Sequence, residues 1–88
     1  MEIIEKKTII EILNGVDLLG EIEQGFISYS QGNCVIPPIG ELIFDDPPGD
    51  VHIKYGYIKG QSNYVIKIAS GHWKNHELGI PNGNGMML

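Results

Sequence analysis

Apolar and polar residues alternate with two different periods along this chain of 88 residues. In the first third, apolar residues recur at spacings of four, four and three, as they do along one face of an α-helix. These residues are Leu18, Ile22, Phe26 and Tyr29. From Cys34 onward the apolar residues alternate with polar ones, which is typical of strands. The pattern predicts an α+β fold in which two N-terminal helices pack on an antiparallel sheet.

Local capping signals predict where the two helices begin and end. Residues 8–11, with the sequence TIIE, match a capping box, so we expect the first helix to begin at Thr8 and to end at Asn14. Asp17 suits the N-cap of the second helix, because its carboxylate can accept an N–H from the first turn. Gly32 is expected to end that helix, because glycine adopts the left-handed backbone conformation without strain.

The second half of the chain is expected to be strand and turn. We predict strands at about residues 40–44, 51–59 and 64–70, the last two forming a hairpin. Residues 71–85 are rich in turn-forming residues and predict a loop. Residues 86–88 look strand-like, yet the chain stops there without a turn or a polar tail, so we expect this sequence to be truncated.

Composition and charge narrow the classes of partner and compartment. Six Lys, no Arg and eleven acids give a net charge of −5, which argues against nucleic acid as a partner because phosphate binding needs a basic face. No apolar run approaches the roughly 20 residues that span a membrane, and the N-terminus lacks the features of a signal peptide. The single Cys34 cannot form an internal disulfide and is expected to be buried, so a cytoplasmic location fits best.

Two lysines are the strongest candidates for ligand binding. Lys67 lies in the middle of an apolar strand, either as a charge that protects a solvent-facing edge or as an ammonium group that holds an anion. If Tyr57 pairs with Tyr64, Lys54 lies directly opposite Lys67, and the two charges repel unless an anion lies between them. A shift of the pairing by one residue would separate the lysines onto opposite faces of the sheet.

Other polar motifs give weaker signals. His72 and His76 have the spacing of a metal-ligand pair on a helix, but the surrounding glycines favour a loop and no third ligand has a fitting spacing. The glycines at 79, 83 and 85 lack the strand, helix and acidic residue that a dinucleotide-binding motif requires. We therefore expect no metal site and interpret both histidines as surface residues.

A set of short motifs gives this chain a family resemblance. Residues 64–71, with the sequence YVIKIASG, are followed by Asn75, by LGIP at residues 78–81 and by Gly85. Together with VIPP at residues 35–38, these motifs resemble the N-terminal part of the ornithine cyclodeaminase and mu-crystallin family. The resemblance covers nearly all of the chain and is strongest from its thirty-fifth residue onward.

The resemblance implies an NAD(P)-dependent enzyme of two domains that acts on a small amino or imino acid. Residues 1–88 would form its N-terminal substrate-binding and dimerisation domain, in which the sheet extends or closes by homodimerisation. A Rossmann domain outside these residues would bind NAD(H) or NADP(H), and the oxidised nicotinamide would accept a hydride from the α-carbon of the substrate. By the family pattern, Lys67 is the catalytic lysine that meets the substrate near its carboxylate. This chain alone is expected to bind no cofactor and to have no turnover.

Two positions depart from the family pattern. Many members have an arginine before the hairpin that clamps the substrate carboxylate, and Lys54 is the nearest substitute here, though it offers a point charge instead of a two-pronged contact. Asn82 stands where many members have Thr or Ser, and we expect it to bind the substrate through a hydrogen bond. An alternative interpretation is a non-catalytic, β-rich oligomerisation or small-ligand-binding module in which the lysines are merely solvated.

Overall fold

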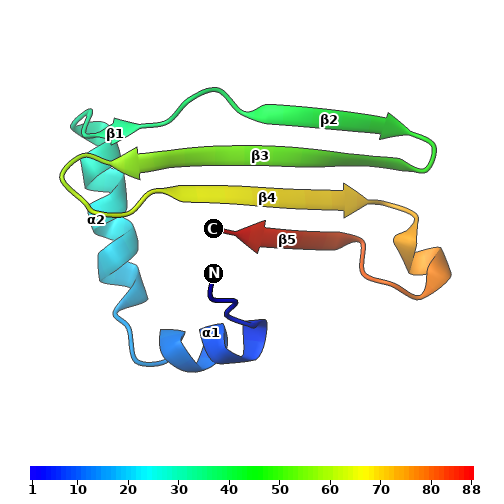
Figure 1. Cartoon of the computed structure of the whole chain (residues 1–88), viewed down its shortest axis with the longest axis horizontal. Coiled ribbons are helices and arrows are strands. Elements are labelled where there is room, and N and C mark those ends of the chain that lie inside the picture. The colour runs from blue at the N-terminus through cyan, green and yellow to red at the C-terminus, as the bar shows by residue number, and fades with distance from the viewer.

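The computed structural model describes all 88 residues as two helices followed by an antiparallel sheet (Figure 1). The helices are α1 (Lys6–Leu13) and α2 (Leu18–Ser30), and a short 3-10 helix, η1 (Asn75–Leu78), comes later in the chain. The strands are β1 (Cys34–Val35), β2 (Gly40–Asp45), β3 (Pro48–Ile58), β4 (Val65–His72) and β5 (Gly83–Met87). The expected α+β class is confirmed.

Of the two predicted N-caps one is confirmed, and both predicted C-terminal ends are confirmed, because α1 ends at its C-cap Asn14 and Gly32 follows α2 with a φ of +74°. Asp17 caps α2, since its Oδ1 accepts a hydrogen bond from the backbone N–H of Gly20 at 3.1 Å. The predicted capping box at Thr8 is wrong, because α1 already begins at Lys6 and no side chain caps it. The two lysines at the start of α1 are good helix formers and extend the helix past that signal. Neither helix combines the length and the apolar character needed to cross a membrane.

Strands β2 to β5 form an antiparallel meander, and β1 pairs with the far end of β3. The central hairpin of β3 and β4 is where the sequence predicts it. The prediction of a loop over residues 71–85 is wrong at both ends, because β4 runs to His72 and β5 begins at Gly83. Backbone pairing with β4 outweighs the turn-forming tendency of glycine here. A Cβ at Gly85 would lie 3.2 Å from the Ile68 carbonyl oxygen, so the close strand approach suits a glycine.

Alternate residues of each strand lie on opposite faces of the sheet. One face, called the polar face below, carries the charged residues of the sheet, Glu41, Asp45, Asp50, His52, Lys54 and Lys67. The other, called the apolar face, carries chiefly Leu42, Phe44, Val51, Ile53, Tyr55, Tyr57, Ile66, Ile68 and Met86. The sheet is therefore amphipathic.

The helices do not cover either face of this sheet, so the expected packing of both helices on it is wrong for the isolated chain. The main contact between a helix and the sheet joins α2 to β3, and Figure 1 shows α2 running across one end of the strands. Residues 31–33 lead directly from α2 into β1, which holds the helix at that end. No hydrophobic side chain is buried, and Cys34 is half-buried instead of enclosed.

Gly56 is expected to be intolerant of a side chain. A Cβ there would lie 2.6 Å from the carbonyl oxygen of Val35, so Gly56→Ala must push β1 away from β3. We expect the substitution to lower the free energy of unfolding by about 1–3 kcal/mol. The measurement is the urea midpoint followed by the fluorescence of Trp73, the single tryptophan of this chain.

Gly25→Ala in α2 is the matched control for this prediction. Nothing lies within 4 Å of a Cβ at Gly25, so alanine should stabilise the helix by up to ~1 kcal/mol. An unchanged midpoint for Gly56→Ala would show that β1 does not approach β3 as closely as described.

Candidate functional site

The two candidate lysines lie directly opposite each other on the polar face. Lys54 of β3 is the cross-strand partner of Lys67 of β4, so of the two registers that the sequence left open, the structure has the one that sets the lysines opposite each other. Opposite residues on one face of an antiparallel pair have Cβ atoms about 4.5–5.5 Å apart. Both ammonium groups therefore lie near the same region of the polar face.

Neither lysine has an acidic partner. The ion pairs of the chain join His52 to Glu41 and to Asp50 and leave both ammonium groups uncompensated. Two like charges 4 Å apart repel by about 1 kcal/mol in water and by more where water is excluded. In a chain with eleven acids, this unbalanced pair indicates a position suited to an anion. Both lysine side chains are exposed, so any closed pocket around them must include surfaces from outside this chain.

Asn82, the third residue predicted to bind substrate, lies at the other end of β4. Its backbone oxygen accepts a hydrogen bond from the N–H of His72, and its Oδ1 accepts one from the N–H of His76 at 2.9 Å. His72 is five residues along β4 from Lys67, which corresponds to about 16 Å at the rise of a strand. This chain does not bring Asn82 and the lysines together, and a substrate contact by Asn82 stays a prediction.

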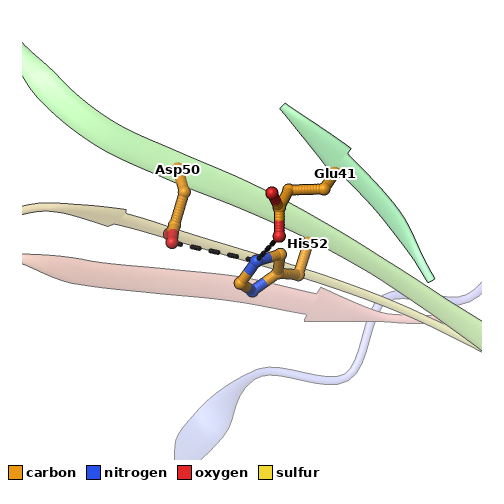
Figure 2. A network of polar contacts seen from close by, with 3 residues as sticks. All are labelled: Glu41, Asp50 and His52. Carbon is orange, nitrogen blue, oxygen red and sulfur yellow. Dashed lines mark hydrogen bonds and ion pairs between the residues drawn. The ribbon is translucent and has the colours of Figure 1, made fainter. Parts of the chain in front are cut away.

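A histidine flanked by two acids lies on the polar face (Figure 2). This residue, His52, is two positions before Lys54 on β3 and is therefore next to the lysine pair. The Nε2 of His52 lies 2.8 Å from the Oε2 of Glu41, its cross-strand partner on β2, and 3.8 Å from the Oδ2 of Asp50. The sequence pattern did not predict this cluster. The alternation of β3 already put His52 on the face of Lys54, but the position of Glu41 depends on the register of β2, which no local signal fixed.

The residues of β4 and β5 that lie next to this cluster on the polar face are small. Ala69 lies opposite His52, and Gly71 lies opposite Asp50. In β5 their partners are Gly85 and Gly83. Between the histidine and the open edge of β5, the polar face therefore lacks large side chains, which leaves room for a ligand beside the lysine pair.

A cavity lined by three tyrosines lies elsewhere and does not include either lysine. It has a volume of about 350 Å³ and is lined mainly by apolar residues, among them Val35, Tyr55, Tyr57 and Tyr64. Tyr55 and Tyr57 belong to the apolar face, so this cavity is part of the uncovered hydrophobic surface.

The two histidines that the sequence offered as weaker candidates, His72 and His76, make contacts within the chain. The ring of His72 stacks on Phe44 with centroids 5.8 Å apart, and His76 contacts the backbone oxygen of Trp73 through its Nδ1. No group of three or more His, Cys, Asp or Glu residues is placed to hold a metal ion. Gly83 and Gly85 lie in β5 and not in a turn between a strand and a helix, so these glycines do not form a dinucleotide-binding loop.

Comparison with known proteins finds no matching family model and no matching solved structure. Two curated proteins are similar to the chain. An uncharacterized cyclodeaminase of Sinorhizobium fredii is 39% identical over 67 residues, which cover 75% of this chain and 20% of that protein. A protein of Rhizobium meliloti, provisionally named a dehydrogenase, is 33% identical over 67 residues, which cover 76% of this chain and 20% of that protein.

The chain thus spans about a fifth of the length of the curated relatives it matches. The names of these relatives agree with the enzyme classes that the motifs around Lys67 implied. The resemblance is confirmed: this chain is similar to part of an ornithine cyclodeaminase-like family, with relatives named as a cyclodeaminase and as a dehydrogenase.

Proposed function

We propose that this chain is the N-terminal substrate-binding and dimerisation portion of an NAD(P)-dependent enzyme that acts on a small amino or imino acid. The observation that carries the proposal is the uncompensated pair of Lys54 and Lys67, opposite each other on the polar face. A carboxylate between the two ammonium groups would relieve their repulsion. The two relatives, named as a cyclodeaminase and as a dehydrogenase, support an enzyme of this class.

The cofactor of this enzyme, NAD(H) or NADP(H), binds outside residues 1–88 in our proposal. The chain spans about a fifth of its relatives, which leaves ample length for a nucleotide-binding domain in a protein of their size. Such a domain would also supply the surfaces that close a pocket over the exposed lysines. A cytoplasmic location belongs to the same proposal and is supported by the free thiol of Cys34.

The apolar face is the proposed dimer interface. Its residues include Leu42, Phe44 and Tyr55, with exposed fractions of 55%, 41% and 44%, and no element of the chain covers them. Contiguous apolar surface of this kind marks an interaction site. A second copy of the chain presents the same face and could bury it by sheet-on-sheet packing. The same observation favours the second candidate function, a non-catalytic oligomerisation module.

Replacement of Lys67 separates these two functions. In the full-length protein, Lys67→Met keeps an unbranched side chain of similar length but removes its charge, and we expect it to lower kcat/KM by about 100-fold or more. The assay is release of ammonia or formation of NAD(P)H with L-ornithine or L-alanine as substrate. Lys59→Met, which removes a charge just beyond β3, is the control and should leave activity unchanged. Equal kcat/KM for the two variants would contradict a substrate-binding role for Lys67.

A charge on the apolar face should weaken the dimer. Leu42→Asp places a carboxylate in the proposed interface, and we expect a rise of at least about tenfold in the dimer dissociation constant, equivalent to 1.4 kcal/mol. Ile43→Asp is the matched control, because Ile43 is the next residue of β2 but lies on the polar face. Sedimentation velocity measures both. A monomeric wild-type protein, or equal effects of the two substitutions, would exclude the apolar face as the dimer interface.

A further inference from the structure

The acid-flanked histidine is the strongest chemical feature that the lysine pair leaves unexplained. His52 precedes Lys54 by two residues in β3, so both point to the polar face and their Cα atoms are about 6.6 Å apart. Glu41 lies directly opposite on β2, with its Oε2 2.8 Å from the Nε2 of His52. Three strands thus bring a carboxylate–imidazole pair next to two ammonium groups.

This arrangement fixes which nitrogen of His52 is available to a ligand. An ionised Glu41 can only accept a hydrogen bond, so the Nε2 of a neutral His52 carries the proton that it donates. The Nδ1 is then an unprotonated acceptor. If Nδ1 gains a proton, the resulting imidazolium lies beside the carboxylates of Glu41 and Asp50, which stabilise its charge.

The other groups around His52 leave this acceptor accessible. Glu41 faces it from β2, Asp50 and Lys54 flank it on β3, and β4 contributes only the methyl group of Ala69 directly opposite. The side chain of His52 is about one third exposed. On β5, the residue opposite Ala69 is Gly85, and the next residue on the same face is Gly83. A ligand anchored at the lysine pair can therefore reach the imidazole across the surface of the sheet.

We propose that His52 accepts a proton from the α-ammonium group of an amino acid whose carboxylate is held by Lys54 and Lys67, with Glu41 as its positioning residue. In this step an N–H bond of the ammonium group breaks, its electron pair stays on the substrate nitrogen, and the proton bonds to the Nδ1 of His52. The product is a neutral amine, the form from which an imine can be made. This inference rests on the proposed function and names its substrate as an α-amino acid in the ammonium form.

The test is the kinetics of the full-length protein with L-ornithine and L-alanine. His52→Gln should lower kcat by about 100-fold or more, the usual contribution of a general base. The acid limb of the pH profile of kcat/KM should disappear, because that limb reports protonation of the base in the free enzyme. Added imidazole should restore part of the activity of His52→Ala, which a structural role of His52 would not produce. Glu41→Gln should lower kcat by less and shift the same limb.

Matched variants separate failure of this inference from failure of the proposed function. His76→Gln removes an exposed histidine of η1 and should leave kcat and the pH profile unchanged. If Lys67→Met loses activity while His52→Gln keeps kcat and the acid limb, the proton-accepting role is wrong and the proposed function stands. If His52→Gln does not fold, an unchanged kcat and pH profile for Glu41→Gln overturns the inference. A wild-type protein that turns over neither amino acid overturns both.

Discussion

The pairing of β3 with β4 is the constraint on which the rest of the molecule depends. Because side chains alternate along a strand, this one register decides that Lys54 faces Lys67 on the polar face. It also decides that the next pair, Ile53 and Ile68, lies together on the apolar face. A slip of one residue would move Lys67 into the apolar face, where an ammonium group has no partner. The two functions proposed for this sheet, binding an anion and binding a second copy, are thus consequences of the same hydrogen-bond ladder.

The chain has no hydrophobic core, and its apolar face is therefore exposed. Burial of apolar surface contributes roughly 25 cal/mol per Å² and is the main favourable term in folding. This chain leaves large apolar side chains exposed on α2 and on the sheet, including Phe26 at 70% and Met86 at 60%. A chain that leaves its own apolar residues exposed would gain stability if another surface covered them, and this chain matches only about a fifth of the length of its relatives.

The charged residues of the polar face lie in separate rows across the strands. Two lysines occupy one row across β3 and β4, and a histidine with two acidic neighbours occupies the next rows across β2 and β3. A positive anchor beside a proton acceptor is a useful combination for chemistry on a small zwitterion. The same separation of charge explains why the net charge of −5 does not describe this surface, since it averages over acids spread along the whole chain.

The sequence by itself determined the α+β class, the cap at Asp17, the position of the hairpin and the resemblance around Lys67, because each depends on neighbours in the chain or on a strict period of two. The register that sets Lys54 opposite Lys67 is decided by the structure. Tertiary structure alone decided that α2 lies across one end of the sheet, that Gly83 to Gly85 form a strand, and that Glu41 meets His52. Those contacts join segments whose relative position no local pattern encodes. Pairing between consecutive strands of the meander supplies the hydrogen bonds that override glycine's preference for turns and set residues 11 apart side by side.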